Sequence, residues 1–247
     1  MICHTGLVSI SFRKKSVGEI IEASLSAGIT AIEWGGDVHV PHGDTETAAR
    51  TAKLCAGAGI ALPEYGSYYY LNESPETFAD VAASARALGT PLIRIWGGKK
   101  SSDALKTEDY AALVADARRV CDMAPERILC LECHKNSVTD EYHTALRFLE
   151  DVDRENLKMF WQPNQFRDLS YNLDALRALL PHIRGVHVFS WDREQMYPLE
   201  RGGDAWRQYL PLLKQAGVRN YMLEFMHDHR IESLPETANT LKTWLEE

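Results

Sequence analysis

Residues 127–132, RILCLE, form a short apolar run that ends in a glutamate, and three later runs repeat this pattern: LKMFWQ (157–162), IRGVH (183–187) and NYMLE (220–224). Each run has the length of a buried strand and is followed by a loop and a helical pattern. Proteins that alternate strands with helices carry their chemistry at the carboxyl ends of the strands. The four runs therefore predict an alternating fold with a site built from their last residues.

The same alternation extends over the whole chain. The predicted strands are Cys3–Ser9, Thr30–Trp34, Ala61–Tyr65, Leu92–Trp96, Ile128–Cys133, Lys158–Gln162, Gly185–Phe189 and Tyr221–Phe225. Amphipathic helical patterns lie between them, for example at 17–28, 45–59, 74–89, 107–123 and 168–182. Ser74-Pro75, Thr107 and Asp168 are expected at helix starts.

Eight strand and helix units in 247 residues match the size of a closed parallel barrel. An open doubly wound sheet would also alternate, but no glycine-rich phosphate-binding motif follows the first strand. We therefore predict an α/β protein that consists of a single (β/α)8 TIM-barrel domain over residues 1–247.

The composition excludes several classes of protein. With 45% hydrophobic and 25% charged residues, the chain is typical of a soluble globular protein, and no apolar run reaches the ~18 residues of a membrane span. The net charge of -8 opposes binding to nucleic acid. The five cysteines are odd in number, and no N-terminal signal pattern is visible. We expect a cytoplasmic protein without a disulfide framework and without a nucleic-acid or membrane partner.

The four runs end in a ligand set for a divalent cation: Glu132, Gln162, His187 and Glu224. Strand alternation allows all four side chains to point into the mouth of a barrel, where two buried glutamates would repel each other without a cation. Oxygen and imidazole ligands favour Mn²⁺, Mg²⁺ or Co²⁺, with Zn²⁺ as a further candidate. Each residue taken singly is also explained by a salt bridge or by a satisfied interior histidine. Their recurrence at four consecutive strands favours the metal site.

Polar and aromatic residues also end the earlier strands: Glu33, Trp34, Glu64, Arg94 and Trp96. Acidic, guanidinium and indole groups together suit a polyhydroxylated ligand, because hydroxyls need hydrogen-bond partners and C–H faces need an aromatic wall. We therefore expect these residues to bind substrate. For the two tryptophans, core packing against the helices is an equally good interpretation.

With these residues in place, the chain resembles the xylose-isomerase-like barrel superfamily over essentially its whole length. Within it, the chain is similar to the sugar isomerase/epimerase branch, which includes ketose 3-epimerases and inosose dehydratases. The resemblance implies a metal held by Glu132, His187 and Glu224 together with Gln162, which stands where the family has an aspartate. Apurinic-site endonucleases share this barrel, but the acidic composition opposes a DNA-binding surface.

The resemblance also implies roles for three further residues. His134, two residues after the first glutamate, and Arg193, six residues after the metal-binding histidine, are expected to contact substrate oxygens. Gln165 stands where the family has a histidine, and we expect it to lie beside the substrate.

The activity that the resemblance implies is that of a metal-dependent isomerase or epimerase, in which Glu132 and Glu224 move a proton next to the carbonyl of a small keto sugar through an enediolate. His134 would polarise an oxygen. Two alternatives remain: a metal-dependent lyase or dehydratase acting on an inosose or 3-keto-glycoside, and, because of Gln162 and Gln165, a barrel that binds a sugar without turnover. The expected partner is an unphosphorylated sugar or polyol, since no phosphate cradle stands out. A homo-oligomer is compatible with the sequence.

Overall fold

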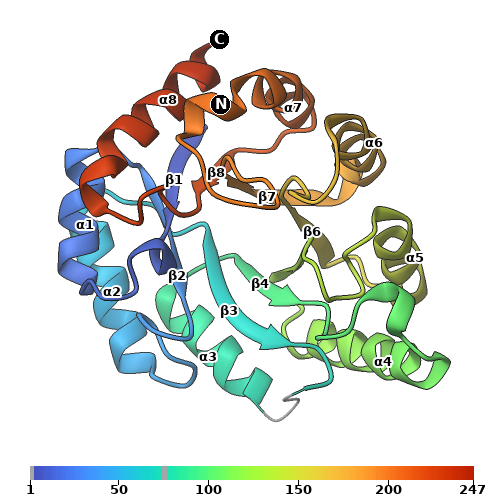
Figure 1. The fold of residues 1–247 in the computed structure, drawn as a ribbon. Helices are drawn as coiled ribbons and strands as arrows, with labels where there is room; N and C mark the ends of the chain where they lie inside the picture. Colours follow the sequence, from blue (N-terminus) through green and yellow to red (C-terminus); the bar gives the residue numbers. More distant parts are fainter. Residues whose placement is uncertain (1–2, 74–76) are drawn as a thin grey trace.

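Parallel strands close into a barrel in the order in which they follow one another in the chain (Figure 1). The computed structural model describes residues 3–73 and 77–247. Its strands are β1 (His4–Val8), β2 (Ala31–Gly35), β3 (Glu64–Tyr70), β4 (Leu92–Trp96), β5 (Ile128–Glu132), β6 (Leu157–Trp161), β7 (Ile183–Val188) and β8 (Asn220–Leu223). Pairing of β1 with β8 closes the ring, so the predicted (β/α)8 barrel is confirmed.

The helices surround the barrel on its outside (Figure 1). They are α1 (Val17–Ser26), α2 (Thr45–Ala58), α3 (Phe78–Leu88), α4 (Thr107–Met123), α5 (Tyr142–Val152), α6 (Leu169–Leu179), α7 (Gly203–Gln215) and α8 (Leu234–Glu246). Short 3-10 helices are η1 (Ser9–Phe12), η3 (Ser102–Ala104), η4 (Leu180–His182), η5 (Leu199–Gly202) and η6 (Ile231–Ser233). None of the helices in the described part of the chain is long and apolar enough to cross a membrane.

The three predicted helix starts differ in how well they agree with the structure. Asp168 caps α6 as expected, because its side chain accepts a hydrogen bond of 2.8 Å from the backbone N–H of Tyr171. Thr107 is the first residue of α4 rather than its cap, and Lys106 takes the cap position. Ser74-Pro75 lies outside the described residues.

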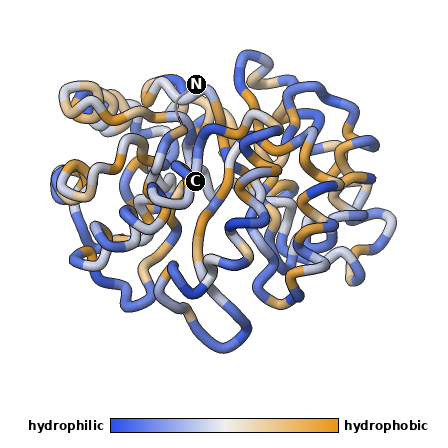
Figure 2. The backbone as a smooth tube through the Cα atoms, turned by 90° about the horizontal axis from the view of Figure 1, so that it is seen from above, coloured by the Kyte–Doolittle hydropathy of each residue, from blue (hydrophilic) through white to orange (hydrophobic). Residues whose placement is uncertain are grey.

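The structure has two hydrophobic regions, one between the strands and the helices and one inside the barrel. In Figure 2, hydrophobic and hydrophilic residues alternate along the turns of the outer helices, as amphipathic helices require. The barrel interior is filled by two small clusters of buried side chains, Val8, Ile10, Ala31 and Met222 in one and Leu92, Cys130 and Phe160 in the other. The interior is therefore a packed floor beneath the carboxyl ends of the strands.

The third strand differs from its predicted range, whereas the others agree within two residues at each end. The sequence pattern placed it at Ala61–Tyr65, but β3 begins at Glu64. Pro63 precedes it and cannot donate a ladder hydrogen bond, so Ala61 makes only an isolated bridge with Ala31. Glu64 consequently stands at the start of its strand, deeper in the barrel than a residue at the strand end.

Two glycines make room for the large side chains inside the barrel. A Cβ at Gly185 would lie 2.3 Å from Phe160 Cε2, and a Cβ at Gly6 would lie 2.0 Å from Met222 Sδ. Both distances are far shorter than van der Waals contact, so any larger residue would displace the floor of the barrel.

We predict that Gly185→Ala lowers the free energy of unfolding by about 1–3 kcal/mol, the usual cost of overpacking a core. Gly57→Ala on α2 is the matched control, because no atom of residues 3–73 or 77–247 lies within 4 Å of a Cβ there. Loss of helix-interior glycine flexibility should stabilise that variant by about 0.5–1 kcal/mol. Urea unfolding of the three proteins measures both changes, and equal stability of the two variants would contradict this packing.

Candidate active site

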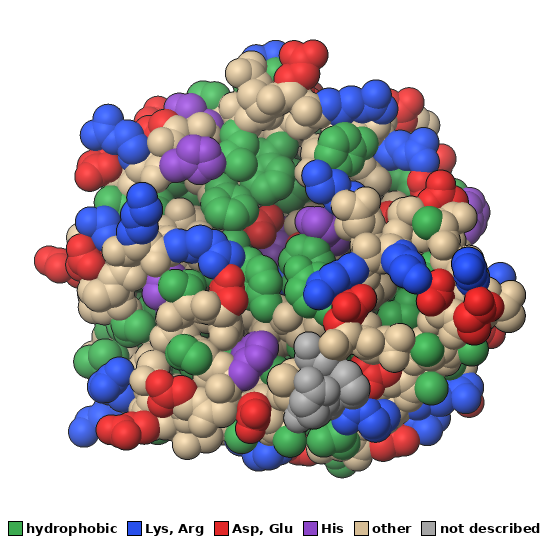
Figure 3. Space-filling model, turned by 60° about the horizontal axis from the view of Figure 1, so that its bottom comes forward, with side chains coloured by type: hydrophobic (Ala, Val, Ile, Leu, Met, Phe, Trp, Pro, Cys, Tyr) green, Lys and Arg blue, Asp and Glu red, His purple; other side chains and the backbone are tan. Residues whose placement is uncertain are grey.

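Ionisable side chains converge at the carboxyl ends of the strands, above the hydrophobic floor. They are Glu33 from β2, Arg94 from β4, Glu132 from β5, His187 from β7 and Glu224 after β8, and all are buried. Figure 3 shows hydrophobic side chains around an acidic side chain and a histidine near the centre of one face. Charged groups at such depth require partners, so their arrangement defines the site.

His187 lies at the centre of the cluster. Its Nδ1 is 3.1 Å from Gln162 Oε1, 3.5 Å from Glu224 Oε2 and 3.8 Å from Glu132 Oε1. Ligand atoms of Glu132, His187 and Glu224 all lie within 4.8 Å of one another. The structure therefore brings together the four residues that the strand ends predict, with one oxygen of each of the other three within 3.8 Å of His187 Nδ1.

Glu33 fixes the orientation of the His187 ring. Its Oε2 lies 3.1 Å from Nε2 of His187, on the side opposite the other oxygens. When Nε2 carries the proton and donates to Glu33, the lone pair of Nδ1 points into the oxygen cluster, as in carboxylate–histidine–metal arrangements. The donor set thus fits a divalent cation: one neutral imidazole, one amide oxygen and two carboxylates.

The pKa values in the cluster follow from its burial and its charges. Burial lowers the pKa of His187, but the carboxylates of Glu224 and Glu33 outweigh it, and the net pKa is raised. Burial raises the pKa of Glu224 to about 7, although the charge of His187 opposes it. Burial also acts to raise the pKa of Glu33, but Arg94 and His187 overcome it and lower that pKa to about 2.

Arg94 neutralises two of these carboxylates. Its Nε donates to Glu33 Oε1 at 2.8 Å, and its Nη1 donates to Glu132 Oε2. Only 1% of Arg94 is exposed, so its ion pairs with Glu33 and Glu132 are shielded from water. Removal of any one of the three side chains would leave a buried charge without its partner. Gly66 makes the close approach feasible, because a Cβ there would lie 2.3 Å from Glu33 Oε1 and 2.7 Å from Arg94 Nη2.

Gln162 donates as well as accepts. Its Nε2 donates to Glu132 Oε1 at 3.2 Å and to the carbonyl oxygen of Cys133 at 2.9 Å. Both oxygens of Glu132 therefore already accept hydrogen bonds, one from Arg94 and one from Gln162. Glu224 has no such donors among its described contacts apart from its proximity to His187. Glu132 and Glu224, which end similar strand patterns in the sequence, therefore have different environments in the structure.

Aromatic side chains form the rim of the mouth. The rings of Trp96 and His134 are 4.2 Å apart, and those of Trp96 and Tyr70 are 5.1 Å apart. On the side of β7 and β8, the rings of Trp191 and Phe225 are 5.6 Å apart. These residues are partly exposed. Burial lowers the pKa of His134, which favours its neutral form beside the cluster.

Two residues expected at the mouth lie elsewhere. Trp34 is 0% exposed and belongs to the core between the strands and the helices, because it alternates with the inward-facing Glu33 on β2. Glu64 is also 0% exposed and lies inside the barrel, where its oxygens have no hydrogen-bond partner among the described residues. Burial and the charge of Glu33 raise the pKa of Glu64 well above its usual value, which favours its neutral form.

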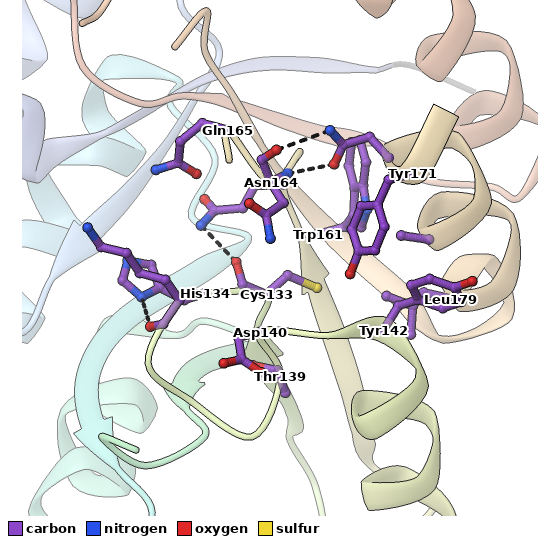
Figure 4. Close-up of a pocket in the computed structure, with 14 residues that line it drawn as sticks. Cys133, His134, Thr139, Asp140, Tyr142, Trp161, Asn164, Gln165, Tyr171 and Leu179 are labelled. Atoms are coloured by element: carbon purple, nitrogen blue, oxygen red, sulfur yellow. Dashed lines mark hydrogen bonds between the residues drawn. The ribbon is translucent and has the colours of Figure 1, made fainter. Parts of the chain in front are cut away.

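Gln165 and Arg193 lie on the loops that follow β6 and β7. Gln165 lines a narrow pocket with Gln162 and His134, beneath the loops after β5 and β6 (Figure 4). Arg193 is exposed, and its Nε donates to the carbonyl oxygen of Phe166 at 3.2 Å. The arginine thus ties two loops together beside the mouth.

Arg13, which no strand-end pattern indicates, also reaches the mouth. Its Nη2 donates to Tyr68 Oη at 2.9 Å, and the Tyr68 ring centroid lies 5.4 Å from Arg94 Cζ. Tyr68 stands at a register shift in β3 with a left-handed backbone, φ 50°. The available signal was the basic run Arg13–Lys15 in the loop between the first strand and the first helix.

Comparisons with known proteins agree with this architecture. No protein-family model matches the chain. Among solved structures, the probable 3-DHS dehydratase AsbF from Bacillus anthracis has a TM-score of 0.82 at 21% identity, with 97% of this chain and 98% of that chain covered. The structure of L-ribulose 3-epimerase has a TM-score of 0.75 at 15% identity, with 99% and 95% covered. This is the fold of the xylose isomerase-like TIM barrels.

Two further similarities are to a dehydratase and to a barrel solved with magnesium. A 3-dehydroshikimate dehydratase of Bacillus anthracis is 25% identical over 199 residues, which are 73% of this chain and 69% of that protein. A xylose isomerase-like TIM barrel protein from Mycobacterium smegmatis, solved in complex with magnesium, has a TM-score of 0.74 at 13% identity, with 98% and 96% covered. Barrels of this fold thus include a metal complex.

We predict that the protein binds about one divalent ion per chain and that its affinity for Mn²⁺ rises with pH through about 7. Glu224 carries a proton below its pKa of about 7, and the raised pKa of His187 also favours a proton, so both groups must lose protons before they can bind a cation. Titration calorimetry about one pH unit on either side of neutrality measures this. Glu224→Gln is the control, and its affinity for Mn²⁺ should change less with pH than that of the wild type. Absence of binding, or an affinity independent of pH, would contradict the assignment.

A second prediction concerns Gln162→Glu. Without metal, the new carboxylate loses both donated hydrogen bonds and faces Glu132, which should lower the free energy of unfolding by about 3 kcal/mol. With Mn²⁺, the additional negative ligand should increase affinity by about tenfold. Thermal unfolding with and without Mn²⁺ measures both, with Gln165→Glu as the neighbouring control. Unchanged metal affinity would place Gln162 outside the coordination sphere.

Proposed function

We propose that this protein is a divalent-metal-dependent enzyme that removes a proton next to the carbonyl of a small polyhydroxylated ketone and then eliminates water. The observation that carries the proposal is the convergence of Gln162, Glu132 and Glu224 oxygens on His187 Nδ1, with Glu33 behind the ring. The 25% identity to a 3-dehydroshikimate dehydratase supports elimination as the outcome.

The residues that would hold the cation are Glu132, Gln162, His187 and Glu224. A bound divalent cation polarises a carbonyl and stabilises the negative charge that develops on its oxygen. Arg94 and Glu33 keep Glu132 and His187 in place, since both are fixed by hydrogen bonds inside the barrel. The aromatic rim excludes water from the apolar faces of the substrate.

Glu224 is the better placed of the two glutamates to take the proton. Both oxygens of Glu132 accept hydrogen bonds from Arg94 and Gln162, whereas Glu224 lies free of these donors. A carboxyl group whose pKa is about 7 also exchanges protons readily near neutral pH. A single group that acts on one face of the substrate suits elimination, because elimination requires only one proton to be removed from carbon.

The elimination balances without a further reactant. The C–H bond next to the carbonyl breaks, its proton passes to Glu224, and its electron pair forms a carbon–carbon double bond. The bond from the neighbouring carbon to its hydroxyl breaks, and the hydroxyl takes the proton back from Glu224 and leaves as water. Neutral His134, beside Trp96, can hydrogen-bond a substrate hydroxyl during this step.

A second candidate is epimerisation of a keto sugar. It is favoured by the positions of Glu132 and Glu224, which both border His187 Nδ1, at 3.8 Å and 3.5 Å. Two carboxylates on different sides of a substrate can remove a proton from one face and return one to the other. The fold similarity to L-ribulose 3-epimerase is compatible with it. In this reaction Arg94 would have to release Glu132.

We predict that Glu224→Gln reduces turnover by more than ~100-fold, the scale of a lost general base, in either reaction. The assay follows 3-dehydroshikimate and L-ribulose in deuterated water by mass spectrometry. Elimination lowers the mass by one water, whereas epimerisation loses no water and raises the mass, because deuterium replaces the hydrogen next to the carbonyl.

The control is Glu194→Gln, an exposed glutamate on the loop after β7, which should retain full activity. Metal content must be equal in all three proteins before the loss is assigned to proton transfer. Wild-type protein that binds metal and ligand but neither eliminates water nor exchanges deuterium would be a sugar-binding barrel without turnover, and the proposal would be wrong.

A further inference from the structure

A groove with a volume of about 480 Å³ lies beside the mouth, between the loops that follow β1 and β8. One wall is formed by residues 10–15, and the other by Phe225 and residues 229–232. Its base is apolar, with Ile10, Phe12, Phe225 and Ile231. A volume of this size is typical of small-molecule sites, which are mostly apolar with a few polar groups that fix orientation.

The groove is rimmed by positive charge although the whole chain carries a net charge of -8. Arg13, Lys14, Lys15 and Arg230 line it, with Glu232 as its acidic residue. Three of these cations already have acidic partners: Arg13 pairs with Asp37, Lys15 with Glu19 at 3.1 Å, and Arg230 with Glu232 at 3.4 Å.

Lys14 differs from the other three cations. It is exposed and has no ion-pair or hydrogen-bond partner among the residues that the structure describes. It therefore offers the groove a charge that none of the described side chains neutralises. An anionic group that enters the groove would meet this charge next to an apolar surface, where screening by solvent is weaker than in open water.

Two residues that line the groove, Phe225 and Arg13, link it to the proposed metal centre. Phe225 follows Glu224 directly, and its backbone N–H donates to Ser11 Oγ at 2.9 Å, which joins the two walls. On the other side, Arg13 reaches Tyr68, whose ring lies over Arg94. Phe225 and His229 both have left-handed backbones, at φ 56° and 57°, a strained conformation that is typical of functional loops.

We propose that this groove is the subsite for an oxyanion on the substrate, a carboxylate or a phosphate group, whose carbonyl end reaches the metal centre. The proposal rests on the proposed function and narrows its substrate class from polyhydroxylated ketones in general to acidic ones. A neutral sugar would gain nothing from Lys14, whereas an acid would gain both charge neutralisation and orientation towards Glu224. The substrate is thereby held at two ends, by the cation site and by the groove.

The test is titration calorimetry of wild-type, Lys14→Gln and Lys53→Gln proteins in the presence of Mn²⁺. Lys53 is an exposed lysine on α2, away from the groove. The ligands are 3-dehydroshikimate, which carries a carboxylate, L-ribulose 5-phosphate, which carries a phosphate, and neutral L-ribulose. We expect Lys14→Gln to raise the Kd of at least one anionic ligand about fivefold, and less at high salt, with L-ribulose unchanged. Lys53→Gln should behave as wild type.

Each result decides one question. Dependence on Lys14 for 3-dehydroshikimate alone identifies a carboxylate subsite, and dependence for L-ribulose 5-phosphate alone identifies a phosphate subsite. Failure of wild-type protein to bind either anion, or a Lys14→Gln effect equal for charged and neutral ligands, overturns the subsite. If an anionic ligand binds in a Lys14-dependent way but is not converted, the subsite is supported and the proposed reaction is wrong. If a ligand is converted with a KM that does not depend on Lys14, the reaction is supported and the subsite is wrong.

Discussion

The buried guanidinium of Arg94 is the interaction on which the rest of the site depends. It joins Glu33 and Glu132 inside the barrel and helps to lower the pKa of Glu33, so the buried Glu33 carboxylate stays ionised. Glu33 in turn holds His187 through Nε2, and Glu132 accepts a hydrogen bond from Gln162. The positions of His187 and Gln162 therefore depend on the fixed guanidinium of Arg94. Gly66 has no side chain, which leaves room for this guanidinium.

This network separates groups that hold the site from groups that are free to react. Glu33, Arg94 and Glu132 are fixed by several hydrogen bonds each, whereas Glu224 and the open side of His187 face the mouth. The neutral amide of Gln162 reduces the negative charge of the cluster by one relative to a carboxylate. A less negative cluster is better suited to an anionic substrate, which agrees with the positive rim of the groove between the loops after β1 and β8.

The sequence predicts the barrel and the meeting of the four strand ends because both depend on local patterns. Period-two alternation fixes which side chains point inwards, and parallel strands bring their carboxyl ends to one face. The same alternation, counted from the inward-facing Glu33, puts Trp34 on the outer face, in the core between the strands and the helices. Glu64 could not be placed in this way, because Pro63 delays the start of β3 and Glu64 therefore lies deep in the barrel. The pairing of Arg94 with Glu33 and Glu132, and the contact between Arg13 and Tyr68, join residues on different strands and loops, which no local pattern reveals.

The most direct test of this account is a crystal structure of the protein with Mn²⁺, with the cation located by its anomalous scattering. The account predicts one strong peak within bonding distance of His187 Nδ1, surrounded by oxygens of Gln162, Glu132 and Glu224, while Glu33 remains bonded to Nε2. A cation bound at another place in the barrel, or bound to Nε2 after displacement of Glu33, would contradict it.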